Sequence, residues 1–187
     1  MRAFRSMIDG LSLRLLFSQF ANDRRGVSAV EFAMLLPLML TLYLGSVEVS
    51  QGISIDRKVN LTAHTVADLV AQVSSIDTAG VNAVLGAATA IMAPYPDKDV
   101  KVTVSVVDID KNGSAKIKWS STKNGTARAI GSSVTVPAAL NTPSTSLVWG
   151  EAAYKYQPSI GYVVTGAMDL TGQIYMRPRL SDSVTKL

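Results

Sequence analysis

A basic pair, a glycine and a single acid lie close together in residues 24–32, at the head of an apolar run. Gly26 has no side chain, so a membrane-embedded protease could unwind the backbone there and cut it on the cytoplasmic side. A cut after Gly26 would free an amine on Val27 and make Glu31 the fifth residue of the mature chain. That amine and that carboxylate could then neutralise each other, within one helix end or between neighbouring subunits.

A weaker constellation lies in the second half of the chain. Asp108, Asp110 and Asn112 begin a D-x-D-x-N-G sequence, as an EF-hand calcium loop does, but Trp119 stands where the closing glutamate is required. Asn-Gly is also a common hairpin turn. We therefore expect a plain turn here and keep calcium binding as the lesser alternative.

Composition and motifs argue against catalysis. The 187 residues include no cysteine, which excludes thiol nucleophiles and cysteine-ligated metal sites. The only histidine, His64, precedes Asp68 by four residues, but no further ligands or nucleophile motif accompany the pair, so we expect a surface or packing histidine.

The net charge of +4 comes mainly from the first 26 residues and forms no basic patch with stacking aromatics. We expect no enzyme, no cofactor, no small-molecule substrate and no nucleic-acid partner.

Residues 24–32 lie at the head of a predicted membrane-spanning helix. The run from Val27 to Val47 has one charged residue, Glu31, and as a helix it would be about 31 Å long, enough to cross a bilayer core of about 30 Å. Arginines precede it, and the first bases after it are Arg57 and Lys58, which predicts a cytoplasmic N-terminus. The run is too long for an ordinary secretory signal and has no A-x-A-like cleavage site. Glu31 could alternatively mark the membrane interface and snorkel.

Periodicity predicts an α+β architecture beyond the membrane. Apolar residues at helical spacing extend the first helix to about residue 75, with a kink expected at Pro37, and Asp77 can cap a second, shorter helix that ends before Pro94. Alternation predicts a hairpin of strands 100–106 and 116–120, and two further strands over 147–157 and 172–176. We expect one small antiparallel sheet packed on the long helix, with the aromatic side chains of these strands in the core or an interface.

Upstream, apolar residues from Phe4 to Leu15 at helical spacing fit either a helix on the membrane surface or a leader without fixed structure.

The sequence RRGVSAVEFAMLLP resembles the class III signal of type IV pilin-like proteins. The residues that carry the resemblance are Arg24, Arg25, Gly26, Val27, Glu31 and Phe32. The sequence is similar in particular to the TadE/TadG-like minor pilins, or pseudopilins, of the tight-adherence (Flp) pilus system. Gly45-x-x-Glu48 and the sequence from Tyr175 to Arg179 also fit that family. The resemblance implies cleavage after Gly26 by a prepilin peptidase, insertion in the bacterial inner membrane, and a part in pilus assembly with other pilins and the assembly platform. The 26-residue leader is long beside those of ordinary pilins.

The resulting expectation is a pilin-like protein in four parts. Residues 1–26 form a cytoplasmic leader that is removed, 27–47 cross the lipid bilayer, 48–75 continue the helix in the periplasm, and 76–187 form a periplasmic α+β domain. The alternative from another class is a single-pass periplasmic binding or sensing module whose anchor merely resembles a pilin. A membrane-tethered hydrolase is a third reading, and it would require a clustered polar site.

Overall fold

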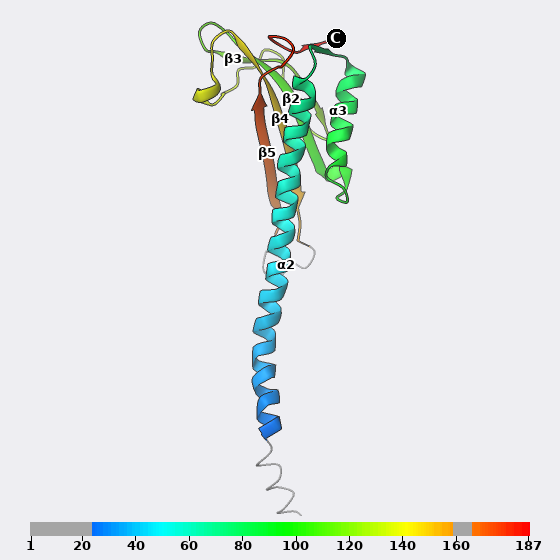
Figure 1. Ribbon diagram of the computed structural model, residues 1–187, viewed down its shortest axis with the longest axis vertical. Coiled ribbons are helices and arrows are strands. Elements are labelled where there is room, and N and C mark those ends of the chain that lie inside the picture. The colour runs from blue at the N-terminus through cyan, green and yellow to red at the C-terminus, as the bar shows by residue number, and fades with distance from the viewer. Residues whose placement is uncertain (1–23, 159–165) are drawn as a thin grey trace, which may run out of the picture. The chain divides into compact units, whose positions relative to one another are not determined.

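The computed structural model describes residues 24–158 and 166–187 (Figure 1). The predicted leader helix around Phe4–Leu15 lies outside these residues. The chain divides into two compact units on either side of the Ser46–Val47 bond. One long helix, α2 (Arg24–Ala71), runs through both units.

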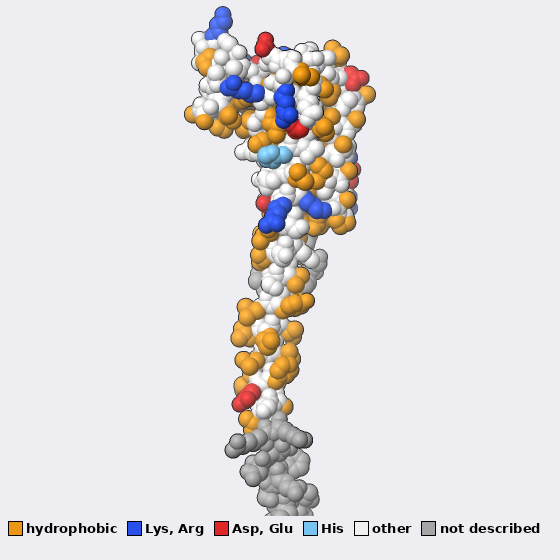
Figure 2. All heavy atoms as spheres, in the orientation of Figure 1, with side chains coloured by type: hydrophobic (Ala, Val, Ile, Leu, Met, Phe, Trp, Pro, Cys, Tyr) orange, Lys and Arg blue, Asp and Glu red, His pale blue; other side chains and the backbone are white. Residues whose placement is uncertain are grey.

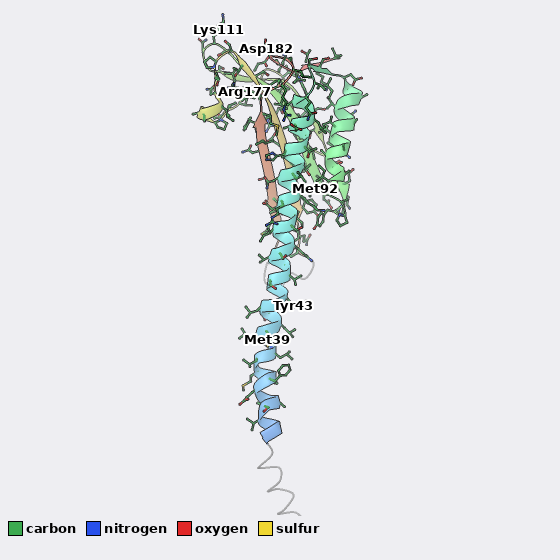
Figure 3. All side chains as sticks on the ribbon, viewed as in Figure 1. Met39, Tyr43, Met92, Lys111, Arg177 and Asp182 are labelled. Atoms are coloured by element: carbon green, nitrogen blue, oxygen red, sulfur yellow. The ribbon has the colours of Figure 1, made fainter. Side chains whose placement is uncertain are left out.

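Helix α2 is continuous through Pro37, although proline lacks the N–H that a helix interior normally uses. The hydroxyl of Thr41, one turn further on, donates to the carbonyl oxygen of Pro37 at 2.8 Å. Hydrophobic side chains cover the first half of the helix (Figure 2). Met39 and Tyr43 project from it with exposed fractions of 58% and 65% (Figure 3). That half of α2 therefore presents its apolar side chains outward.

The second helix, α3 (Thr78–Ala90), follows the predicted cap. Oδ1 of Asp77 accepts a hydrogen bond from the Gly80 N–H at 2.7 Å, which satisfies one of the donors that a helix start leaves free. Val81, Leu85 and Ala88 form its buried stripe. The predicted helix, its cap and its buried face are confirmed.

Four antiparallel strands form the sheet, in the order β3-β2-β4-β5. Their bounds are Val100–Ile109 for β2, Ala115–Lys123 for β3, Thr145–Tyr156 for β4 and Met168–Met176 for β5. The hairpin and the two later strands are thus confirmed, although β5 begins four residues before its predicted start. Short 3₁₀ turns at Asp97–Asp99 and Ala138–Leu140 lie in the connections.

The sheet has a different hydrophobic core on each face. The inner core joins the second half of α2 and α3 to Val100, Val102, Val104 and Val106 of β2. The α+β architecture, with one small antiparallel sheet on a long helix and one extra helix, is therefore as predicted. A smaller core on the outer face holds Val107, Ile109, Ala115, Ile117, Val136, Leu147 and Trp149.

A parallel pair of two-residue strands, β1 (Ser75–Ile76) and β6 (Thr185–Lys186), was not predicted. Between β5 and β6 the chain buries Val184 completely. The indole Nε1 of Trp119 donates to the carbonyl oxygen of Val184 at 2.9 Å. The C-terminal segment therefore closes one end of the inner core.

Candidate functional site

The predicted processing site lies at the beginning of α2. Arg24, Arg25 and Gly26 are helical, at the start of the described part of α2. A Cβ placed on Gly26 would meet nothing within 4 Å, and Val27 is 58% exposed. No side chain among the described residues packs over this bond, but a protease would have to unwind the helix to cut it.

Glu31 lies on the same helix face as Val27, because residues four apart are neighbours on a helix surface. Their Cα atoms are about 6 Å apart along the axis. Glu31 is exposed and Phe32 is 59% exposed. The structure therefore places the prospective amine one turn from the carboxylate, on a face that the described residues leave uncovered.

These residues occupy a helix that is long and apolar enough to cross a membrane, the one such helix among the described residues. Its most apolar stretch is not buried against other parts of the chain. An exposed apolar helix of this length is unusual in a soluble domain but ordinary in contact with lipid.

A second acid on α2, Glu48, has a different environment from Glu31. Glu48 is 2% exposed and belongs with the fully buried side chains. The Tyr156 hydroxyl lies 3.5 Å from the carbonyl oxygen of Glu48, its acceptor. Burial, followed by the nearby charge of Glu48, raises the pKa of Tyr156. Glu48 therefore belongs to the packed interior of the sheet and helix.

His64 and Asp68 have different environments in the structure. His64 is exposed, whereas Asp68 forms an ion pair with Arg179 and accepts a hydrogen bond from Nε2 of Gln72 at 2.6 Å. The Arg179 backbone N–H also donates to the carbonyl oxygen of Ala71 at 2.9 Å. Asp68 thus holds the C-terminal segment against the end of α2, and the histidine lies on the surface as expected.

The two aspartates of the D-x-D sequence also point to different partners. Oδ1 of Asp110 accepts the backbone N–H groups of Asn112 and Ser114, at 2.8 and 2.9 Å, and thereby shapes the β2–β3 turn. Asp108 instead accepts from the Ser183 hydroxyl at 3.0 Å. The predicted hairpin turn is confirmed, and its carboxylates serve the turn and the C-terminal segment. The described residues contain no group of three or more His, Cys, Asp or Glu side chains that could hold a metal ion.

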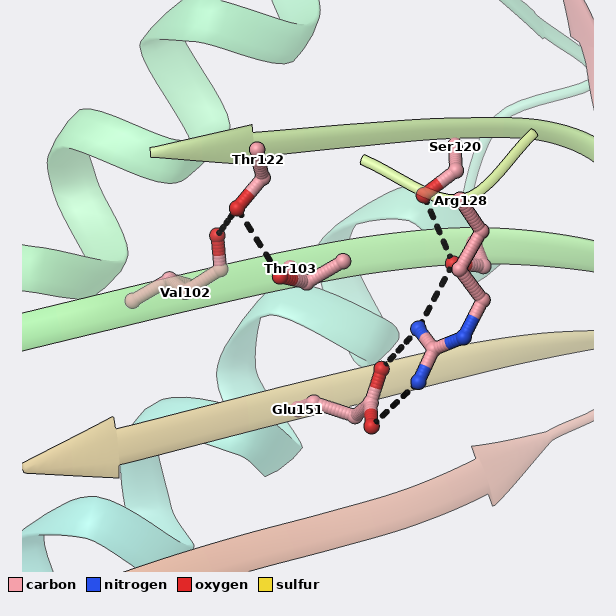
Figure 4. A network of polar contacts seen from close by, with 7 residues as sticks. Val102, Thr103, Ser120, Thr122, Arg128 and Glu151 are labelled. Atoms are coloured by element: carbon pink, nitrogen blue, oxygen red, sulfur yellow. Dashed lines mark hydrogen bonds and ion pairs between the residues drawn. The ribbon is translucent and has the colours of Figure 1, made fainter. Parts of the chain in front are cut away.

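An arginine that the sequence pattern did not single out organises the outer face of the sheet. Both guanidinium Nη atoms of Arg128 bind the carboxylate of Glu151, one of them at 2.8 Å (Figure 4). The guanidinium also lies 3.8 Å from the centroid of the Trp149 ring, which stacks on Tyr175 with centroids 5.1 Å apart. Arg128 therefore attaches the connection 124–144 to the sheet. It does so through a bidentate ion pair with Glu151 and a cation–π contact with Trp149.

Beside this pair lies an open hollow of about 540 Å³ over β2, β4 and β5. Its lining includes the polar residues Lys101, Thr103 and Gln173 beside Arg128 and Glu151. Hydroxyl groups bridge β2 and β3 at its margin, where Thr103 and Thr122 are 2.9 Å apart (Figure 4). No sequence motif predicts this hollow, because its residues come from three strands and a connection.

Comparisons with known proteins bear on α2. Residues 26–68 match the family model described as TadE-like protein, a match that covers less than a quarter of the chain. No curated protein matches the chain significantly. No solved structure matches it significantly either. The matched range begins at Gly26 and ends at Asp68, so it includes the candidate processing site, the membrane-competent stretch and the helix that packs on the sheet. The resemblance predicted from the sequence is therefore confirmed, and residues 26–68 form a TadE-like segment.

Proposed function

We propose that the protein is a TadE-like minor pilin, or pseudopilin, that acts in assembly of a tight-adherence (Flp) type IV pilus. The observation that carries this proposal is the TadE-like segment, which coincides with an exposed apolar helix headed by Gly26, Val27 and Glu31. The described residues after position 47 pack into a hydrophobic core on each face of the sheet. This supports a structural role.

In this proposal a prepilin peptidase removes residues 1–26 on the cytoplasmic side of the bacterial inner membrane. Residues 27–47 remain in the bilayer, 48–75 continue the helix into the periplasm, and 76–187 form the periplasmic domain. The basic residues before the span and the scarcity of bases after it support this orientation.

Cleavage would also change the electrostatics at the start of α2. Arg24 and Arg25 place two positive charges directly before Gly26. Their removal would leave the Val27 amine, with Glu31 one turn away to balance it. The new pair could be satisfied between the helices of adjacent subunits, and this would make lateral association depend on processing.

Mass spectrometry of the protein extracted from bacterial membranes tests the proposal. We expect a mature N-terminus at Val27. A chain that still begins at Met1 in a strain with an active prepilin peptidase would contradict the processing step. A binding or sensing module with a similar anchor would in addition be found outside any pilus preparation.

A further inference from the structure

Helix α2 and strand β5 enclose an apolar groove of about 390 Å³ in the part of the chain that begins at Val47. Its apolar lining comprises Val49, Gly52, Ile53, Tyr156, Met168 and Leu170. Val49 and Ile53 are 49% and 50% exposed, and Met168 is 39% exposed. Exposed apolar surface that is gathered in a groove is typical of an interaction site.

Asp56 gives the groove an accessible carboxylate, and Glu48 lies buried in its wall. Glu48 and Asp56 both line it, and with Gly52 between them they follow one row of α2 at a spacing of four residues. Glu48 is 2% exposed, and Asp56 is partly buried and accepts from Nδ2 of Asn60 at 3.2 Å. In such a partly dehydrated setting a cation is attracted more strongly than it would be in water.

A complementary surface lies on another face of the same helix. Arg57 and Leu61 are four residues apart and form a ridge that points away from the sheet. Leu61 is 55% exposed, and Arg57 is exposed and makes no ion pair with any other described residue. The ridge thus presents one apolar side chain and one cation, which are the two features that the groove would bind.

We propose that the groove of one copy receives the Arg57–Leu61 ridge of a second copy, with Arg57 against Asp56 and Leu61 against Met168 and Leu170. The inference rests on the proposed function in one respect: insertion in one membrane makes the two α2 helices parallel. It goes beyond that function because it assigns a contact between copies outside the membrane segment.

The geometry of α2 makes this contact heterologous. At about 100° per residue, the ridge lies about 130° around the helix from the groove, more than a third of a turn. Each copy therefore offers its ridge to one neighbour and receives the ridge of another in its groove. Such an interface does not close on itself as a two-fold dimer does, and it can repeat along a row of subunits. Aligning the ridge, centred near residue 59, with the groove, centred near residue 52, shifts neighbouring helices by about 10 Å along their axes.

The absence of cysteine from the chain allows a specific crosslinking test on the full-length protein in bacterial membranes. Two differently tagged copies are expressed together, one carrying Leu61→Cys and the other Met168→Cys, and are then oxidised. We expect a disulfide-linked dimer that contains both tags. The matched control, Leu61→Cys in both copies, should give at least tenfold less dimer, because a heterologous contact does not bring two ridges together.

Charge reversal tests the acidic groove in the same assay. Arg57→Glu in the copy that carries Leu61→Cys should reduce the crosslink at least fivefold, and Asp56→Arg in the other copy should restore it. Lys101→Glu, an exposed reversal on the sheet, is the control and should have no effect. Asp56 is preferred to Glu48 for this test because replacing a fully buried residue could unfold the chain.

The outcomes separate this inference from the proposed function. A mature N-terminus at Val27 without the mixed crosslink would overturn the inference alone. Equal crosslinking in the Leu61→Cys control, or a crosslink that does not respond to Arg57→Glu, would also overturn it. So would a groove that holds a co-purified phospholipid in native mass spectrometry and loses it on Asp56→Arg, because the groove would then bind lipid.

Discussion

Arg179 and Asp68 form an ion pair between positions 111 residues apart, and so bring the C-terminal segment to the end of α2. The Arg179 backbone supports the same contact through its N–H bond to the Ala71 carbonyl oxygen, at 2.9 Å. Asp68 is also the last residue of the TadE-like segment. The C-terminal segment around Arg179 therefore contacts the end of the TadE-like segment.

Replacing Arg179 by alanine should have a small effect on stability. The side chains of Arg179 and Asp68 are 59% and 35% exposed, so solvent screening limits the pair to no more than about 1 kcal/mol of the free energy of unfolding. The backbone hydrogen bond to Ala71 would remain. Denaturant unfolding of the full chain in detergent measures the change, and Arg177→Ala is the control. A loss above about 2 kcal/mol would show that the ion pair is more than a surface contact.

Gly150→Ala should be strongly destabilising. A Cβ at Gly150 would lie 2.4 Å from the carbonyl oxygen of Ala63 and 2.8 Å from the Ala67 Cβ, so β4 and α2 would have to separate. Such overpacking costs about 1 to 3 kcal/mol, and more where backbone must move.

Gly86→Ala provides the matched control for Gly150→Ala, because it adds the same methyl group inside α3, where a Cβ meets nothing within 4 Å. It should stabilise the chain by about 0.5 to 1 kcal/mol, because alanine is the better helix former. Thermal unfolding of the two variants checks both directions. Similar losses in both would contradict the close approach of β4 to α2.

Local patterns predicted most elements of this fold, and they failed where distant residues decide the outcome. Ile117 and Trp119 alternate with polar residues as though both faced one core. The β2–β3 register shifts between Val106 and Val107, so Ile117 packs in the outer core and Trp119 in the inner one. A bulge of this kind leaves no periodic signal.

In the candidate site too, local sequence predicts residues that are close in the chain and misses those that the fold brings together. Residues 24–32 could be singled out because their chemistry lies within nine consecutive positions of one helix. Arg128 could not, because a lone arginine in a connection gains its role from Glu151 and Trp149, which the sheet brings to it. The β1–β6 pair was missed because two-residue strands have no alternation to detect.

Arg128→Lys should destabilise the outer face of the sheet despite conserving the charge. Lysine cannot bind Glu151 with two parallel hydrogen bonds or stack its head group on Trp149. We expect a loss of about 1 to 2 kcal/mol, with a shift in tryptophan fluorescence. A double-mutant cycle with Glu151→Gln should show that the two losses are not additive. Additive losses would mean that Arg128 acts without Glu151.

Tyr156 should contribute to unfolding at high pH. Burial, and then the charge of Glu48, raise the pKa of Tyr156, so the folded chain holds the phenolic proton more tightly than the unfolded chain does. The associated stability is complete below the unfolded pKa near 10 and is lost as the pH rises through the folded pKa. Tyr156→Phe should therefore make stability fall less steeply above about pH 10, while Tyr154 and Tyr175, whose pKa values are also raised by burial, keep part of the slope. Unfolding free energies at pH 8, 10 and 11 test this, and an unchanged slope would contradict it.

Glu31→Gln should separate processing from assembly. Glutamine keeps the size of the side chain and leaves Gly26 and the basic pair intact, so the prepilin peptidase should still produce an N-terminus at Val27. The variant cannot balance the new amine, and an amine left uncompensated in a bilayer is unfavourable. We therefore expect at least a tenfold loss of co-purification between two tagged copies and of surface pili, whereas Tyr43→Phe in the same helix should behave as the unaltered protein. If Glu31 merely marks the membrane interface, the Glu31→Gln variant will assemble normally.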